Sequence, residues 1–192
     1  MLDARYLKLL AFLALAQSWA GRRFIAAKLG YGEGVVRRII EVGRGQGHIT
    51  VNRAGVKITE AGLAYLASAL STCKLKLLLS TAKFPQKFCG RICVAFSYGE
   101  EIKSLVAFRD ELVRRGACGA IIMALVGGRL HIPLANMYLE DLDAETALSI
   151  KERAKEGETV IMSCGDNFSQ ALAPIEICDD GTRPIGEDRH PI

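Results

Sequence analysis

The chain has 192 residues, 50% of them hydrophobic, and a formal net charge of +4 at pH 7. This length allows one large domain or two small ones, and no long tract has the composition of a disordered segment. Residues 1–75 carry eleven Lys or Arg against four Asp or Glu, a net of +7, whereas residues 76–192 carry fourteen against seventeen, a net of −3. We therefore expect a basic module that binds a polyanion, joined to a module with another role.

The N-terminus predicts a soluble first helix over residues 4–18 rather than a secretory signal. Its apolar run covers only Leu9–Ala16, and Asp3 lies where a signal carries positive charge. No other segment approaches the roughly 20 apolar residues that span a bilayer. We expect a cytoplasmic protein without membrane contact.

Two further helices follow in the basic module. The segment GRRFIAAKLG predicts a helix that ends at Gly30, and a third helix is predicted from about Glu33 to Val42. Helical spacing turns one face of the third helix to a core, namely Val36, Ile39, Ile40 and Gly43. The opposite face should point outward, namely Arg37, Arg38, Glu41 and Arg44.

A hairpin and a fourth helix complete the basic module. The β-branched runs His48–Asn52 and Val56–Ile58 flank the turn sequence RAG. Thr59 suits the N-cap of a helix that continues through EAGLAYLASALSTCKL. Apolar residues three and four apart predict a heptad seam that packs on the first helix or pairs with a twin to form a homodimer. The seam comprises Leu63, Leu66, Leu70, Cys73 and Leu77.

This order of three helices, hairpin and helix resembles a winged helix-turn-helix domain over residues 1–78. The resemblance rests on Leu29-Gly30, the turn Tyr31–Glu33, the run Val36–Ile40 and the segment Thr59–Gly62. The glycines of KLGYGEG could instead cradle a nucleotide phosphate, but a dinucleotide fingerprint follows a strand, and this segment follows a helix.

The resemblance implies that the third helix enters the major groove of double-stranded DNA with its first residues against base edges. Arginine can bond guanine through two hydrogen bonds, and glutamate can accept one from cytosine. The predicted base-reading residues are Glu33, Gly34, Arg37 and Arg38. The predicted phosphate contacts, which position the protein without reading sequence, are Arg22, Arg23, Lys28, Arg44 and Arg53. A winged helix that binds another protein is the alternative.

Residues 84–180 predict a second module with the order β-α-β-β-α-β. This order predicts a two-layer α/β sandwich, with helices on one face of a mainly antiparallel sheet, so the fold class of the chain is α+β. Gly127-Gly128 marks a hairpin turn, Asp143–Glu156 a helix, and residues 181–192 an extended tail.

The segment FRDELVRRGACGAIIMALVGGRLHIP, together with the winged-helix motif, resembles a small archaeal family. That family joins an N-terminal winged helix-turn-helix domain to a C-terminal domain of unknown function. The analogy implies that the second module senses a small-molecule effector or mediates dimerisation. The chain is therefore predicted to be a DNA-binding transcriptional regulator and not an enzyme.

No metalloprotease, serine-hydrolase or phosphate-loop motif occurs, and we predict no catalytic residue, metal site or cofactor. The segment SCGDNFSQ could present backbone N–H groups and a thiol to an anionic ligand, which is also the basis for a small-metabolite enzyme as an alternative. Otherwise, Asp166 or Asn167 merely caps a helix. The candidate ligand loop comprises Ser163, Cys164, Gly165, Asp166 and Asn167.

The six cysteines contain no C-x-x-C pair, and we expect most of them to be small buried hydrophobes. The chain has only four Gln and three Asn, as in thermophiles, where intracellular disulfides occur, so disulfide formation stays open. A redox or metal switch on Cys89 and Cys93 is a further hypothesis.

Overall fold

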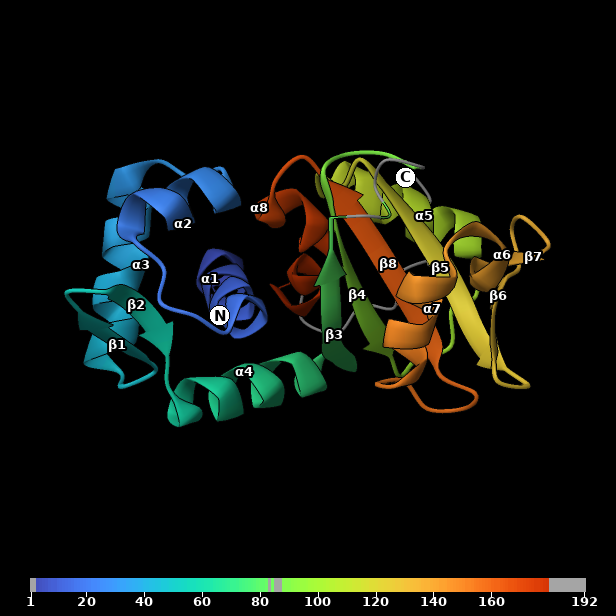
Figure 1. The fold of residues 1–192 in the computed structure, drawn as a ribbon, viewed down its shortest axis with the longest axis horizontal. Coiled ribbons are helices and arrows are strands. Elements are labelled where there is room, and N and C mark those ends of the chain that lie inside the picture. The colour runs from blue at the N-terminus through green and yellow to red at the C-terminus, as the bar shows by residue number, and fades with distance from the viewer. Residues whose placement is uncertain (1–2, 83, 85–87, 180–192) are drawn as a thin grey trace, which may run out of the picture.

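The computed structural model describes residues 3–82, 84 and 88–179. Figure 1 shows a helical N-terminal part packed against one side of a sheet. The N-terminal elements are α1 (Ala4–Ala16), α2 (Arg22–Leu29), α3 (Glu33–Gly45), β1 (Ile49–Asn52), β2 (Gly55–Ile58) and α4 (Glu60–Thr72). The predicted order of three helices, hairpin and helix is therefore confirmed, with α3 reaching three residues beyond Val42.

Local signals define the ends of these helices. Gly30 ends α2 with a φ of 69°, a left-handed conformation that favours glycine. The Thr59 side chain accepts a hydrogen bond from the Gly62 N–H at 3.1 Å, so Thr59 caps α4 as predicted. Ala20 forms a β-bridge with Val56, which adds a third extended segment beside the hairpin.

The fourth helix is shorter than predicted. It ends at Thr72, Lys74 adopts a left-handed φ of 57°, and Leu75–Thr81 forms the strand β3. The prediction of a helical heptad seam is therefore wrong beyond Leu70, because Leu77 lies in a strand. A leucine-rich run is compatible with the apolar spacing of a helix and with that of a strand. Here the hydrogen bonds to the strand Ile92–Tyr98 favour the extended form.

The sheet part contains the remaining elements. They are β3, β4 (Ile92–Tyr98), α5 (Leu105–Arg114), β5 (Gly119–Val126), β6 (Arg129–Ile132), β7 (Met137–Tyr138), α6 (Leu139–Leu142), α7 (Ala144–Lys151), β8 (Thr159–Gly165), α8 (Phe168–Ala171) and the 3-10 helix η2 (Ala173–Asp179). The six strands lie in the order β3-β4-β8-β5-β6-β7, and all neighbours are antiparallel. The mixed α+β class is confirmed. The predicted tail lies outside the described residues.

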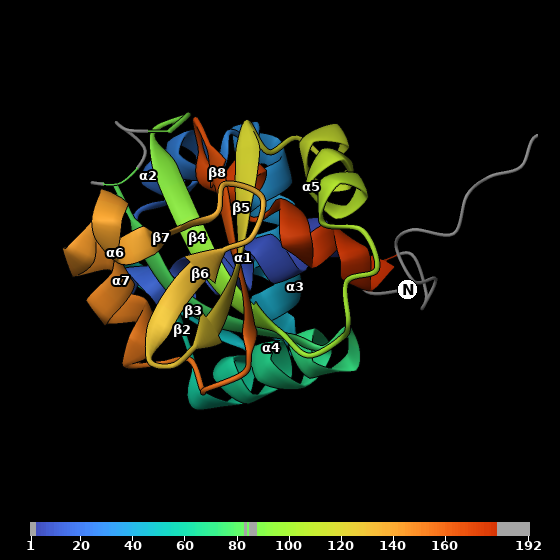
Figure 2. The same ribbon diagram turned by 90° about the vertical axis from the view of Figure 1, so that its right-hand side faces the viewer.

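Helices cover both faces of this sheet, so the expected two-layer arrangement was wrong. Val94 and Phe96 of β4 point toward α5 and α8, whereas Ala95 of β4 belongs to a second cluster with residues of α6 and α7. Figure 2 shows the sheet between these two layers. Strands buried on both faces have continuous apolar runs, so their sequences do not reveal how many faces are covered.

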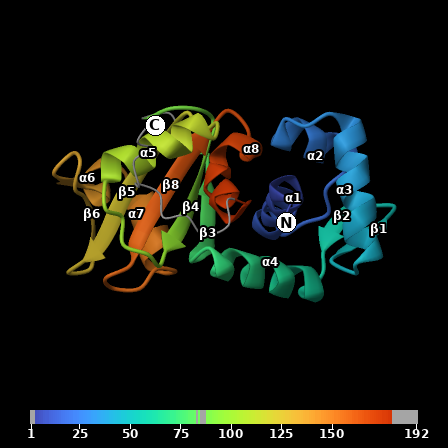
Figure 3. The ribbon, with the colours of Figure 1, turned by 180° about the vertical axis from the view of Figure 1, so that it is seen from behind.

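The two parts share one hydrophobic core. Leu9 and Leu10 of α1 belong to the same buried cluster as Phe96 of β4 and Ile175 of η2. Figure 3, the view from behind, shows α1 next to α8 and η2. The expected boundary at residue 78 falls inside β3, which pairs with β4, so the chain passes from one part to the other without a linker.

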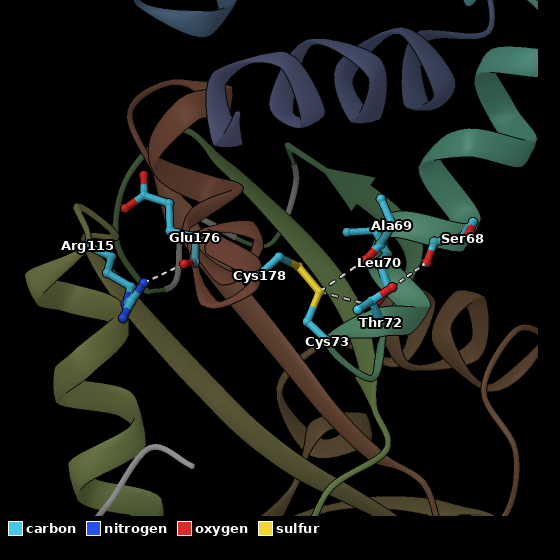
Figure 4. The surroundings of a disulfide bond; sticks show 8 residues. All are labelled: Ser68, Ala69, Leu70, Thr72, Cys73, Arg115, Glu176 and Cys178. Atoms are coloured by element: carbon cyan, nitrogen blue, oxygen red, sulfur yellow. Dashed lines mark hydrogen bonds between the residues drawn. A yellow bond between two sulfur atoms is a disulfide. The ribbon is translucent and has the colours of Figure 1, made fainter. Parts of the chain in front are cut away.

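All six cysteines form disulfides: Cys73–Cys178, Cys89–Cys118 and Cys93–Cys164. The expectation of mostly free thiols was therefore wrong. Cys93 lies directly opposite Cys164 in the β4–β8 register, with 4.0 Å between their Cα atoms. Figure 4 shows the Cys73–Cys178 bond, which joins the end of α4 to η2. The pairing follows from the sheet register and from the packing of η2, neither of which is visible in the spacing of cysteines.

Candidate nucleic-acid interface

The third helix is amphipathic and is held by its apolar face. Val36, Ile39 and Ile40 are buried in the shared core. A Cβ on Gly43 would lie 2.5 Å from Cδ1 of Ile49, so glycine permits the close approach of α3 to the hairpin. This packing leaves the opposite face of α3 open to solvent.

Every residue predicted to contact DNA is exposed. The set comprises Arg22, Arg23, Lys28, Glu33, Gly34, Arg37, Arg38, Arg44 and Arg53. These residues come from α2, α3 and the turn of the β1–β2 hairpin. Figures 1 and 3 place α3 and the hairpin at the end of the molecule that is furthest from the sheet. The predicted residues are thus brought to one end of the protein, although they span 32 positions from Arg22 to Arg53.

Two of the arginines have acidic neighbours. Arg37 donates to Glu41 at 2.9 Å, one helical turn away, and Arg23 lies 3.8 Å from Glu33. Both pairs are solvent-exposed, so each contributes little and can be exchanged for a phosphate or a base. Among the described residues, Arg38, Arg44 and Arg53 form no ion pair.

The helices α2 and α3 both begin at a glycine without a side-chain cap. The caps are Gly21 and Gly32, and no heavy atom lies within 4 Å of a Cβ built on either. The first N–H groups of both helices are thus open to a ligand from solvent. Arg22 and Arg23 in the first turn of α2 favour an anion there, whereas Glu33 in the first turn of α3 opposes one.

A stack of three rings fixes the start of the hairpin. Tyr6 and His48 share a hydrogen bond of 2.8 Å between the hydroxyl and Nδ1, and the His48 ring stacks on Tyr65 at 4.3 Å. Burial, with a smaller contribution from Tyr65, raises the pKa of Tyr6 to about 12. The stack joins α1 and α4 to the start of the hairpin, so the His48 side chain helps to hold these elements together.

The turn between α2 and α3 is in contact with α8. The Ser169 hydroxyl donates to the Tyr31 hydroxyl at 3.0 Å. A Cβ on Gly30 would lie 2.6 Å from Nδ2 of Asn167, so the amide packs directly on this turn. Burial is the main cause of a raised pKa of Tyr31. The sequence contained no signal for this contact, because its partners lie 138 residues apart.

The candidate ligand loop leads into this contact. The Asn167 side chain accepts from the Gln170 N–H at 3.1 Å and caps α8, which agrees with the simpler of the two interpretations. Cys164 is fully buried in its disulfide, so it presents no thiol. Ser163 Oγ is buried and has no hydrogen-bond partner among the described residues. The loop therefore places Asn167 against the turn between α2 and α3.

The remaining hypotheses concern metal and redox chemistry. Within residues 3–82, 84 and 88–179, no group of three or more His, Cys, Asp or Glu side chains is placed to hold a metal ion. Cys89 and Cys93 belong to different disulfides, so they do not form a common site. None of the described helices has the length and apolar character needed to cross a bilayer.

Comparisons with known proteins agree with this architecture. Residues 89–175 match the family model of a domain of unknown function, DUF4443. The fold is similar to that of the hypothetical protein PH0730 from the archaeon Pyrococcus horikoshii OT3, with a TM-score of 0.66 and 22% identity over 90% of each chain. No curated protein matches the chain. The expected likeness to an archaeal family that contains a domain of unknown function is thus supported for the second part and for the fold.

Proposed function

We propose that residues 4–72 form a winged helix-turn-helix domain and that the protein is a DNA-binding transcriptional regulator. In this interpretation α2 and α3 are the helix-turn-helix pair, the β1–β2 hairpin is the wing, and the Ala20 bridge supplies the third short strand. The observation that carries the proposal is the two-sided character of α3. Its apolar face is buried, and its arginines point outward beside the basic residues of α2 and the hairpin.

The exposed residues divide into two roles. Arg37 and Arg38, near the middle of α3, can reach base edges when the start of that helix enters the major groove. Arg22, Arg23 and Arg53 flank the helix on α2 and on the hairpin, where phosphates of the two strands would pass. The uncapped start of α2 adds backbone N–H donors for a phosphate.

We propose that the sheet part senses a small-molecule effector or mediates assembly. The contacts of Asn167 and Ser169 with the α2–α3 turn support this role, since any shift of α8 would change the position of that turn. An effector regulates DNA binding only if it binds two arrangements of α8 with different affinity.

The test is fluorescence anisotropy of the full chain with duplex DNA over a series of salt concentrations. The full chain is needed because truncation near residue 80 would cut through β3. The five predicted phosphate contacts imply that log K falls with log salt at a slope of about −4.5. The double variant Arg37→Ala with Arg38→Ala should lose affinity for a selected operator and keep its melting temperature.

A matched control is Lys103→Ala with Arg114→Ala, which removes the same charge from exposed positions of the sheet part. This control should bind DNA like the native chain. Equal weakening by both double variants would mean that only net charge matters. No binding at about 0.15 M salt would favour the alternative function, a winged helix that binds another protein.

A further inference from the structure

We infer that the Cys89–Cys118 disulfide is a redox switch, which a dithiol reductant opens and which thereby loosens the contact of α8 with the α2–α3 turn. The inference rests on the proposed function in so far as this turn belongs to the proposed DNA-binding elements. Of the three disulfides, only this one contains an exposed residue, Cys118. The Cys73–Cys178 pair is half-buried, and the Cys93–Cys164 pair is fully buried. Exposed disulfides are the ones that thiols reduce most readily.

The opening of this disulfide is a two-electron exchange. A thiolate of the reductant attacks Sγ of Cys118, the S–S bond breaks, and Cys89 leaves as a thiolate that takes up a proton. The second thiol of the reductant then attacks the mixed disulfide and releases Cys118 as a thiol. Two electrons and two protons have then passed from the dithiol to the two cysteines, and the reductant is left with an internal disulfide.

The segments before β4 and before β5 flank the end of β8, and the disulfide joins these two segments to each other. On one side, the Arg91 N–H donates to the Gly165 carbonyl at 2.8 Å. On the other side, the Cys118 N–H donates to the Cys164 carbonyl at 2.8 Å. A Cβ on Gly90 would lie 2.5 Å from the Gly165 carbonyl and 2.9 Å from Sγ of Cys118. The disulfide therefore clamps the end of β8.

The end of β8 in turn positions α8. A Cβ on Gly165 would lie 2.4 Å from the Cβ of Gln170, and Oε1 of Gln170 accepts from the Asp166 N–H at 2.8 Å. The next residue, Asn167, packs on Gly30 in the α2–α3 turn. Figure 1 shows α8 between the sheet and α2. A continuous set of contacts therefore leads from the disulfide to this turn.

Reduction of the exposed disulfide leaves the rest of the fold in place. Cys93–Cys164 still joins β4 to β8, and Ala171 and Leu172 at the end of α8 stay in the buried core. The added freedom is confined to the segment from Gly165 to Asn167 and to the turn that it contacts. Because a loosened turn must be ordered again when DNA binds, the reduced form should bind DNA more weakly.

The first test contains no DNA. The full native chain is exposed to dithiothreitol for increasing times, alkylated and mapped by mass spectrometry. Cys89 and Cys118 should be alkylated at least about tenfold faster than Cys93 and Cys164. Hydrogen exchange of the selectively reduced chain should then rise in residues 165–170 and 26–34 and stay unchanged in α7. Equal alkylation rates for the two pairs, or unchanged exchange in both segments, would overturn the inference.

The second test compares the oxidised and the selectively reduced chain by anisotropy with duplex DNA. Reduction should weaken binding about fivefold or more, the lower end of the usual coupling between two sites. Equal affinity of the two forms would overturn the inference. Absence of binding by both forms would contradict only the proposed function, because alkylation and hydrogen exchange still decide whether the switch exists.

Two double variants make the test specific to this disulfide. Cys89→Ser with Cys118→Ser should bind DNA like the selectively reduced chain and should not respond further to dithiothreitol. Cys73→Ser with Cys178→Ser removes a different disulfide and should keep the response. Circular dichroism checks that each variant folds, and the selectively reduced native chain gives the comparison if the first variant does not. A full response of the first variant to dithiothreitol would also overturn the inference.

Discussion

The ammonium group of Lys8 lies 2.5 Å from Oε1 of Glu176, which follows 168 residues later in the chain. Only 3% of the Lys8 side chain is exposed, whereas 33% of the Glu176 side chain reaches solvent. Arg115 donates to the backbone carbonyl of Glu176 at 2.6 Å, as Figure 4 shows, and also to Glu111. These contacts fasten η2 to α1, the helix on which the proposed DNA-binding elements pack.

Removing the Glu176 carboxylate should destabilise the fold by an amount that depends on pH. Burial lowers the pKa of Lys8 below its ordinary value of 10.5, and the hydrogen bond with Glu176 opposes that shift. Glu176→Gln should cost about 3 kcal/mol at pH 7, because a buried cation loses its partner. A lysine with a lowered folded pKa penalises folding below that pKa, and the penalty disappears as the pH rises to 10.5. Urea denaturation at several pH values measures both effects.

Lys8→Met serves as the control for this prediction. It removes the cation and keeps an unbranched apolar side chain, while Glu176 can be hydrated. At pH 7 the Lys8→Met variant should be about as stable as the native chain. Its stability should also lack the change with pH that the titration of Lys8 causes in the native chain. If Glu176→Gln is as stable as the native chain at neutral pH, Lys8 does not depend on its partner.

The disulfide that closes the longer loop should contribute more to stability, because the entropy cost of closing a loop rises with the logarithm of its length. Cys73→Ser with Cys178→Ser opens a loop with a sequence separation of 105 and should cost about 4.7 kcal/mol. Cys89→Ser with Cys118→Ser opens a separation of 29 and should cost about 3.6 kcal/mol. Denaturant unfolding without reductant gives this ranking. Alkylation of the unfolded, unreduced chain followed by intact mass should find no free thiol, and six modified cysteines would contradict the pairing.

The two classes of proposed DNA contact should respond differently to substitution. Arg53→Ala, at the hairpin turn, should weaken binding to all sequences alike and reduce the salt slope by about 0.9. Arg38→Ala, on α3, should cost about 1–3 kcal/mol on a selected operator and much less on unrelated DNA. Anisotropy with both duplexes separates the cases. The same loss of specificity in both variants would remove the distinction between base and phosphate contacts.

The hydrogen bond between the hydroxyls of Ser169 on α8 and Tyr31 in the α2–α3 turn should be a measurable link between the two parts. Tyr31→Phe and Ser169→Ala each remove one partner of the 3.0 Å hydrogen bond and should each cost about 1 kcal/mol. Because the second substitution removes a bond that the first has already broken, the double variant should cost less than the sum. Additive costs in denaturant unfolding would show that the hydroxyls act independently.

The sequence by itself determined the N-terminal elements, because their signals are local. Gly30 needs a left-handed backbone at a helix end, Thr59 caps the helix that follows it, and the spacing of Val36, Ile39 and Ile40 defines one face of α3. The exposure of Arg37 and Arg38 followed from the same spacing. Each of these features depends on residues within about one helical turn.

Three features were determined only by the tertiary structure: that Leu75–Thr81 forms a strand, which cysteines pair with each other, and that Lys8 is buried. A leucine-rich run is compatible with helix or strand, and the free edge of β4 selects the strand. Cys93 meets Cys164 through the β4–β8 register, and Lys8 meets Glu176 only because η2 folds back on α1. These contacts join residues 71 and 168 positions apart, where neither residue restricts the conformation of the other until the whole chain packs.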